Sequence, residues 1–168
     1  MDRRVGPVLG SILFLAAAPG TVAGLVPRLL TGWRFGPPFL GWPGTRVAGL
    51  LIGALGLEIL LESFARFALQ GLGTPAPVAP TERLVVSGWY RRVRNPMYVG
   101  VLSLVLGQAL LFGSPALLWY SVALALGFHL FVIGYEEPTL QAQFGAQYAA
   151  YRAQVGRWWP RLRPWRPE

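Results

Sequence analysis

The side chains best suited to chemistry in this sequence are charged and aromatic residues at the ends of long apolar segments. Arg94, Asn95 and Pro96 stand directly before one such segment, and Tyr98 follows closely. Asn is a preferred N-cap and Pro a preferred first helical residue, so these residues predict a helix start. The free N–H groups of that start favour an anion, to which Arg94 would add a bidentate donor. A plain helix start explains Asn95 and Pro96 equally well, but it explains neither Arg94 nor Tyr98.

Two acidic residues, Glu136 and Glu137, lie where the last apolar segment ends. Acids at a helix C-terminus oppose the helix dipole, so this placement is unfavourable unless an arginine or a cationic ligand compensates. The alternative is a pair of solvated acids at a helix end. A short connection before the last segment brings Arg94 and Glu136 to the same end of adjacent helices. The sequence therefore predicts an Arg–Glu pair at a membrane surface as the core of a site.

Other ionisable residues lie inside the apolar segments. Glu58, Glu62 and Arg66 have the i, i+4, i+8 spacing that places them on one helical stripe. An acid inside a membrane segment suggests function, whereas a Glu62–Arg66 ion pair would be structural, and both readings stay open. His129 is more often a structural hydrogen-bonding residue than a ligand. With this single histidine and no cysteine, a multi-histidine or thiolate metal site is excluded, and we expect no metal.

The elements that carry these residues are predicted to be membrane helices. The 168 residues are 54% hydrophobic and only 13% charged, with a mean hydropathy of +0.45, which favours a bilayer over a soluble core. A cleaved signal peptide is the alternative for the first segment, because Thr21-Val22-Ala23 resembles a cleavage site. A kink is expected at Pro19-Gly20. The apolar segments run over about 5–30, 47–69, 96–112 and 115–135.

The arginines predict how the chain is oriented. Three of the 15 basic residues, Arg28, Arg34 and Arg46, lie at or between the facing ends of the first two apolar segments, and the other twelve lie at the N-terminus, around the 70–95 connection and after the last segment. The positive-inside rule therefore predicts a multi-pass protein with both termini and that connection in the cytoplasm. The net charge of +8 suggests anionic headgroups or an anionic ligand as partners. Nucleic acid is disfavoured, because the arginines separate apolar runs instead of forming one polar face.

Polar stretches follow the second and the fourth segment. The Gly/Pro-rich stretch 71–80 predicts a non-helical linker. Residues from Leu140 to Val155 predict an amphipathic cytoplasmic helix, because Leu140, Phe144, Tyr148, Tyr151 and Val155 have helical spacing. Trp158, Trp159 and Trp165, which stand among arginines, are predicted interfacial anchors. The fold class is therefore an all-α integral membrane bundle of about four transmembrane helices. We expect a single domain, 1–168, with two N-terminal helices in 1–70 and the ligand-binding half in 71–168.

An ordered series of motifs then resembles the isoprenylcysteine carboxyl methyltransferase family, which also takes in related phospholipid methyltransferases. The similarity covers roughly 71–160, and many members have His where this chain has Asn95. The matching motifs are Gly73-Thr74-Pro75-Ala76-Pro77, Gly88-Trp89-Tyr90, Val93-Arg94-Asn95-Pro96-Met97-Tyr98-Val99-Gly100, Glu136-Glu137, and Leu140, Phe144-Gly145, Tyr148, Tyr151 and 157–160.

The resemblance implies an enzyme that transfers a methyl group from S-adenosyl-L-methionine, bound by the C-terminal half, to a lipophilic acceptor such as a lipid or a prenylated compound. The acceptor group, a carboxylate or an amine, stays open. The resemblance to bacterial family members implies a bacterial inner membrane. Arg94 would hold the carboxylate of the cofactor, Glu136 or Glu137 its sulfonium and amine, and Tyr148 or Trp158 its adenine. Arg94 and Glu137 are the expected catalytic residues. The expected cofactor-binding residues are Tyr90, Arg94, Asn95, Pro96, Tyr98, Gly100, His129, Tyr135, Glu136, Glu137, Tyr148 and Tyr151.

Two other functions remain compatible with the sequence. A membrane reductase with a nicotinamide cofactor would share the C-terminal half, and cofactor binding separates it from a methyltransferase. A non-enzymatic membrane protein would tolerate alanine at Arg94 and at Glu136-Glu137.

Overall fold

The structure is a computed structural model that describes residues 5–70 and 83–166. The predicted linker 71–80, with the Gly73–Pro77 motif, lies outside the described residues, as do Arg3 and Arg4. Within the described part, every regular element is helical, which confirms the predicted fold class. The longer elements are α1 (Val5–Gly20), α2 (Val26–Thr31), α3 (Gly44–Gln70), α4 (Pro96–Phe112), α5 (Pro115–Phe131) and α6 (Glu137–Gln154). The short ones are η1 (Thr21–Leu25), η2 (Phe39–Gly41), η3 (Gly88–Arg91) and η4 (Val132–Glu136).

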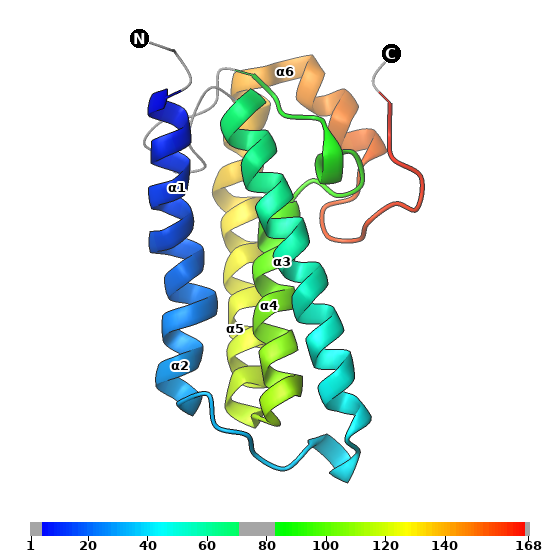
Figure 1. Cartoon of the computed structure of the whole chain (residues 1–168). Helices are drawn as coiled ribbons and strands as arrows, with labels where there is room; N and C mark the ends of the chain where they lie inside the picture. Colours follow the sequence, from blue (N-terminus) through cyan, green and yellow to red (C-terminus); the bar gives the residue numbers. More distant parts are fainter. Residues whose placement is uncertain (1–4, 71–82, 167–168) are drawn as a thin grey trace.

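The long helices form a bundle that fits a membrane. The pair α1–α2, α3, α4 and α5 run along a common direction, and α6 lies across their upper end (Figure 1). Ile12–Thr31, Gly44–Leu69 and Pro115–Gln154 are long and apolar enough to span a bilayer, and 96–112 is a shorter apolar helix. Large apolar side chains point outward along the bundle, for example Leu13 at 69% exposure. The chain is therefore a multi-pass integral membrane protein.

Helices α1 and α2 form one continuous helix. A π-helical turn joins them where the sequence predicted a kink at Pro19-Gly20. This turn, η1, follows Pro19-Gly20 directly, and Pro27 stands in the first turn of α2 just after it. The helix continues without interruption through the possible cleavage site at 21–23. A second π-helical turn, η4, joins α5 to α6.

Four glycines let α3 and α4 approach each other closely. Gly49 and Gly56 on α3 are seven residues apart, and so are Gly100 and Gly107 on α4. A Cβ atom built on Gly107 would lie 2.7 Å from the Gly49 carbonyl oxygen, and one on Gly100 would lie 2.8 Å from the Gly56 carbonyl oxygen. Small residues at this spacing let antiparallel membrane helices pack backbone against backbone. This contact fixes the frame onto which the other helices pack.

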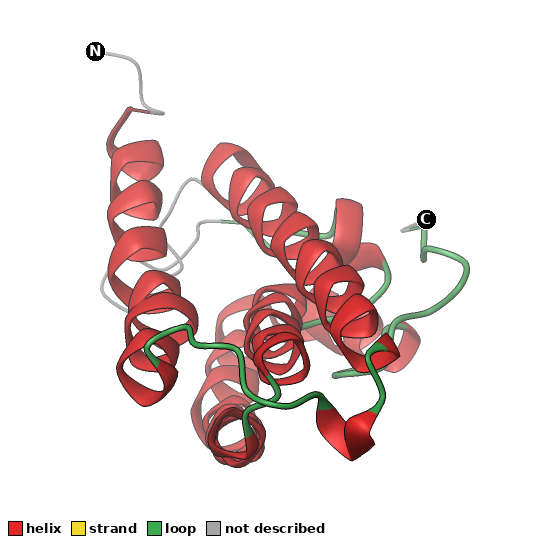
Figure 2. Cartoon of the chain, turned by 60° about the horizontal axis from the view of Figure 1, so that its bottom comes forward, coloured by secondary structure: helices red, strands yellow, loops and turns green. Residues whose placement is uncertain are grey.

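The two ends of the bundle are closed differently. At the lower end, α4 stops at Gly113, which has the left-handed φ of 65° that glycine adopts without strain. The Ser114 side chain then accepts a hydrogen bond from Leu117 N at 3.3 Å and begins α5. This confirms the predicted tight hairpin. The connection between α2 and α3 crosses the same end (Figure 2), and Gly36 N donates to the Phe112 carbonyl there at 2.8 Å.

At the upper end, α6 confirms the predicted amphipathic helix. Tyr148, Tyr151 and Val155 form a buried cluster with Leu140 and Phe144. The helix is interrupted at Gly145, which divides α6 into two pieces. Only one of the predicted anchors, Trp159, is largely exposed, at 86%. Trp165 packs on Tyr151 and Trp158 packs inward, so these two tryptophans stabilise the upper end itself.

Replacing Gly107 with alanine tests the close packing of α3 and α4. We expect Gly107→Ala to lower the free energy of unfolding by about 1–3 kcal/mol, because its methyl group meets backbone atoms of Gly49 and Gly53. The matched control is Gly127→Ala on α5, where nothing lies within 4 Å of the new methyl group. Thermal unfolding in detergent measures both. Equal melting temperatures for the two variants would contradict the packing model.

Candidate active site

A cavity of about 420 Å³ lies near the upper end of the bundle. Its walls come from α1, η1, α3, α4, α5, η4, α6 and the stretch before α4. Its size falls within the range of small-molecule sites, about 300–1,000 Å³. The lining residues are Phe14, Ala18, Pro19, Val22, Phe64, Phe67, Leu84, Val85, Tyr90, Arg94, Asn95, Pro96, Met97, Tyr98, Val101, Phe128, Phe131, Tyr135, Glu136, Thr139, Leu140, Gln143, Tyr148 and Tyr151.

The cavity has an apolar side and a polar side. On the apolar side, Phe14 and Ala18 of α1 and Val22 of η1 face Phe64 of α3 and Phe128 of α5. These residues belong to segments long and apolar enough to span a bilayer, so this is the side of the cavity toward the membrane-spanning part of the bundle. The polar side is built by the start of α4 and by the junction between α5 and α6. An amphiphilic molecule matches this division, with its apolar part among the phenylalanines and its polar end toward α4.

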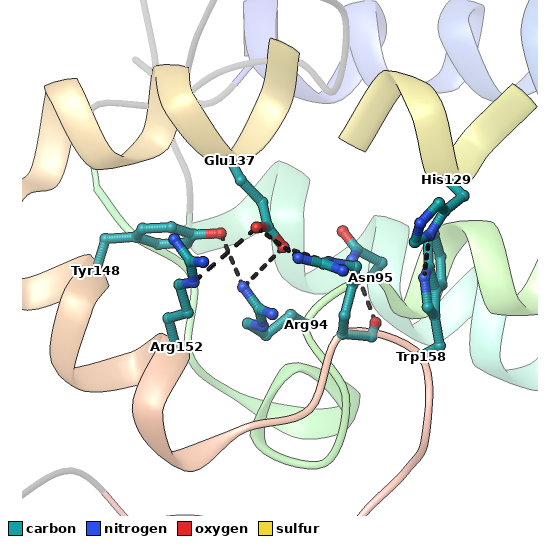
Figure 3. A network of polar contacts seen from close by, with 8 residues as sticks. Arg94, Asn95, His129, Glu137, Tyr148, Arg152 and Trp158 are labelled. Atoms are coloured by element: carbon teal, nitrogen blue, oxygen red, sulfur yellow. Dashed lines mark hydrogen bonds and ion pairs between the residues drawn. The ribbon is translucent and has the colours of Figure 1, made fainter. Parts of the chain in front are cut away.

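The polar side rests on one carboxylate, Glu137, which binds several arginines (Figure 3). Arg94 Nη1 lies 2.9 Å from Glu137 Oε1, and Arg157 makes a bidentate contact at 2.6 and 2.9 Å. Arg152 lies farther away, at 4.0 Å. The hydrogen bond to this carboxylate raises the pKa of the Arg157 guanidinium. Three cations surround one anion, so the cluster keeps a positive excess.

The predicted Arg–Glu pair therefore forms with Glu137 and not with Glu136. Consecutive residues of a helix point about 100° apart, so the two acids face different neighbours. Glu136 turns toward the cavity, where it accepts a hydrogen bond from the Tyr98 hydroxyl at 2.9 Å. Tyr98 also packs against Phe128, with ring centroids 4.7 Å apart. One acid therefore binds the arginines, and the other one faces the cavity.

Arg94 keeps part of its donor capacity. Its side chain is only 8% exposed, and its Nη1 also donates to the Tyr148 hydroxyl at 3.2 Å. Its Nε atom is buried without a hydrogen-bond partner, although Arg94 lines the cavity. A buried charged donor without a partner is costly unless a ligand satisfies it. Arg94 is therefore suited to hold an anionic group.

The segment after α6 completes the polar side. Arg94 N donates to the Gly156 carbonyl at 2.9 Å, and Arg161 N donates to the Arg92 carbonyl at 2.9 Å. These backbone bonds hold Arg157 against Glu137. Asn95 occupies the N-cap position of α4, but its side chain makes no capping bond and donates instead to the Arg157 carbonyl at 3.2 Å. The predicted capping role of the Asn95 side chain is therefore replaced by a contact with the C-terminal segment.

The structure brings together most of the residues expected at the site. Tyr90, Arg94, Asn95, Pro96, Tyr98, Tyr135, Glu136, Tyr148 and Tyr151 line the cavity, and Glu137 lies behind Arg94. Burial raises the pKa of Tyr90 well above its usual value, so its phenol stays neutral.

Two expected site residues lie elsewhere. Gly100 is not among the lining residues and packs against Gly56 of α3. His129 is also outside the lining and accepts a hydrogen bond from Trp158 Nε1 at 3.0 Å, which is the structural role weighed for it (Figure 3). The Glu62–Arg66 ion pair weighed for α3 is present at 2.7 Å, away from this cavity.

Sequence reasoning missed the N-terminal half of the site and the partner of Glu137. The α1 and α3 side chains that line the cavity belong to apolar stripes that look like any helix packing face. Phe14, Ala18 and Val22 do repeat at a spacing of four residues, which is the available signal. Arg157 stood within a matching motif, but nothing in its local pattern indicated that it faces Glu137.

The fold and the site define an integral membrane protein with a part-apolar, part-charged cavity at one end of its helical bundle. The family model described as phospholipid methyltransferase matches residues 45–147, which is more than half of the chain. The chain belongs to this family, and this makes it a membrane methyltransferase. The match begins earlier and ends earlier than the 71–160 expected from the motifs. Searches of curated proteins and of solved structures found no significant match.

Removing the Glu137 carboxylate tests its role in the arginine cluster. We expect Glu137→Ala to lower the free energy of unfolding by about 3–5 kcal/mol, because it leaves the buried Arg94 without its counter-charge. The control is Arg152→Gln, whose exposed and distant contact should cost less than about 1 kcal/mol. Thermal unfolding in detergent compares the two, and similar losses for both variants would refute this role.

Proposed function

We propose that this protein transfers the methyl group of S-adenosylmethionine to the polar end of a lipophilic acceptor in the cavity between α1, α3, α4 and α5. The observation that carries the proposal is the division of this cavity into a phenylalanine-rich side toward the membrane-spanning part of the bundle and a charged side at the start of α4. Membership of the phospholipid methyltransferase family supports the reaction type and favours it over a nicotinamide-dependent reductase.

The anionic end of the cofactor fits Arg94. The unpartnered, buried Nε of this residue and the positive excess of the cluster around Glu137 suit a carboxylate. The backbone N–H of Met97 adds to this, because Met97 lines the cavity in the first turn of α4, next to Pro96, which has no N–H. Arg94 would bind and orient the cofactor there, and Glu137 would keep the Arg94 side chain in position.

The cationic part of the cofactor fits Glu136 and its aromatic neighbours. S-Adenosylmethionine, when bound, supplies a methyl group on a positively charged sulfur. The Glu136 carboxylate and the rings of Tyr98 and Tyr135 line the cavity and attract cations. The Tyr98 hydroxyl donates to Glu136 and so fixes the direction of the carboxylate. Tyr148 is only 2% exposed, with its hydroxyl bound to Arg94, so it positions Arg94 in addition to lining the cavity.

The acceptor would place its apolar chain among Phe14, Phe64 and Phe128 and its polar end near Glu136. Methyl transfer is an in-line displacement, so this chain contributes mainly by alignment and by excluding water. An amine acceptor has to lose a proton, and Glu136 is the carboxylate of the described lining that can take it. A carboxylate acceptor needs no such base. The product of the reaction therefore identifies the acceptor class.

Cofactor binding by the purified protein in detergent tests the proposal. We expect titration calorimetry to detect one site for S-adenosylmethionine, and Arg94→Ala to weaken it roughly ten- to a hundredfold, which is the scale of a lost hydrogen bond to a charged group. Arg94→Lys should recover only part of this loss, because an ammonium lacks the planar fork. Arg152→Gln is the control, since it removes a charge from the same cluster outside the cavity lining.

Transfer of a labelled methyl group into a lipid extract then identifies the chemical class of the acceptor. A base-labile product indicates a carboxyl ester, and a base-stable product indicates a methylated amine. Glu136→Gln should slow transfer to an amine by about 10²-fold or more and leave the protein folded. Binding of a nicotinamide dinucleotide in place of S-adenosylmethionine would overturn the proposal.

We also propose that the upper end of the bundle faces the cytoplasm of a bacterial inner membrane. The arginine distribution supports this orientation, since Arg28, Arg34 and Arg46 alone lie in or beside the opposite connection. The cofactor would then reach the cavity from the compartment in which it is made.

Reporter fusions test this orientation. A fusion after Arg34 should report the outer side, and a fusion after Glu168 should report the cytoplasm. The arginine asymmetry drives this outcome, because positively charged loops are retained on the inner side. The same side for both fusions would contradict the four-span topology.

A further inference from the structure

A second pocket of about 660 Å³ lies on the other side of η3 from the cavity. The two share none of their lining residues, because Trp89 of η3 lines this pocket whereas Tyr90 lines the cavity. The pocket is open and lies between the C-terminal third of α3, η3 and the C-terminal segment. Its lining residues are Glu58, Glu62, Arg66, Val86, Ser87, Gly88, Trp89, Arg91, Arg92, Pro164 and Arg166. Neither the methyl-transfer proposal nor the family match gives this pocket a role.

The charges of the pocket favour an anion. Four arginines and two glutamates line it, so its formal charge is +2. Both glutamates already have partners within the wall. Glu62 lies 2.7 Å from Arg66 Nε, and both carboxylate oxygens of Glu58 accept from Trp89 Nε1 at 3.2 and 3.1 Å. An incoming cation would therefore meet occupied carboxylates and a positive field.

Two of the arginines are fixed in place without being neutralised. Arg91 Nε donates to the Trp165 carbonyl, and Arg92 Nη1 donates to the Leu162 carbonyl at 2.6 Å. A carbonyl oxygen orients a guanidinium but carries no counter-charge. Arg92 also lies over the Trp89 ring, 5.8 Å from its centroid. Arginines that are already held in fixed positions lose little side-chain entropy on ligand binding, so this wall is preorganised for a ligand.

The wall exists because η3 approaches α3 very closely at Gly88. A Cβ atom there would overlap the Glu62 carboxylate, and the backbone has a φ of 53°, a conformation that side chains disfavour. The positive φ favours glycine at this position, and the turn brings Trp89 N within 3.4 Å of Glu62 Oε2 and the indole within reach of Glu58. The glycine of the Gly88-Trp89-Tyr90 motif thus shapes this pocket, while Tyr90 serves the cavity.

The pocket borders a surface that faces lipid. Leu57 and Leu61, which are 46% and 48% exposed, lie beside Glu58 and Glu62 on α3, inside a segment long enough to span the bilayer. We propose that this pocket binds the phosphate of an anionic phospholipid, whose acyl chains lie along Leu57 and Leu61. Four arginines surround the phosphate, namely Arg66, Arg91, Arg92 and Arg166. The Trp89 indole lies at the membrane–water interface. The site is separate from the methyl-transfer cavity and does not depend on the reaction proposed there.

The full chain in detergent micelles tests the proposal by titration calorimetry with three probes: dihexanoyl phosphatidylglycerol, dihexanoyl phosphatidylcholine and inorganic phosphate. We expect phosphatidylglycerol to bind at least about tenfold more tightly than either other probe, since it offers a net negative charge and apolar chains together. Arg66→Gln combined with Arg166→Gln should weaken that binding roughly tenfold or more. The exposed Arg66–Glu62 pair contributes little stability, so the double variant should fold.

The matched control is Arg83→Gln combined with Arg163→Gln, which removes the same charge from exposed arginines outside the pocket lining. It should bind phosphatidylglycerol within twofold of the unaltered chain. Titration of S-adenosylmethionine into both double variants tests whether the two sites are separate. Its affinity should be the same in both variants as in the unaltered chain. Equal affinity for phosphatidylcholine, or retention of binding within twofold in the Arg66/Arg166 variant, would overturn the proposal. If inorganic phosphate binds as tightly as phosphatidylglycerol, the pocket recognises free phosphate and the lipid proposal is wrong.

Discussion

The charged end of this protein depends on one buried carboxylate, that of Glu137. A carboxylate with a 7% exposed side chain is stable only when cations surround it. Arg94, directly before the start of α4, and Arg157, from the segment after α6, supply those cations. The same contact therefore joins three separate parts of the chain and sets the shape of the polar side of the cavity. The charge that remains after the pairing leaves this side positive.

An apolar frame makes this concentration of charge possible. The glycine contacts between α3 and α4 hold the backbones close, and a two-residue turn keeps α5 beside α4. Because lipid surrounds these helices, charged groups gather where the bundle ends, at η3 and α6. The η3 turn then separates two environments. Tyr90 faces the cavity to which we assign methyl transfer, and Trp89 faces an arginine-rich pocket beside exposed leucines.

The sequence by itself determined the features that depend on local pattern. Long apolar runs predicted the membrane bundle, and Gly113-Ser114 predicted the hairpin between α4 and α5. The helix start at Pro96 and the amphipathic stripe of α6 were equally readable. An i, i+4 spacing also made the Glu62–Arg66 ion pair one of two open readings, and the structure contains it. In each case the interacting residues lie within a few positions of one another, so helical geometry alone brings them together.

Only the tertiary structure decided which side chains meet across the site. Adjacent helical residues point about 100° apart, and the π-helical turn η4 shifts this phase, so no sequence pattern distinguishes Glu136 from Glu137 as the partner of Arg94. Arg157 joins Glu137 from 20 residues away because backbone bonds fold the C-terminal segment back over the start of α4. Phe14 reaches the cavity only through the packing of α1. Such contacts depend on how whole helices are rotated and placed, which is a property of the complete packing and not of any one segment.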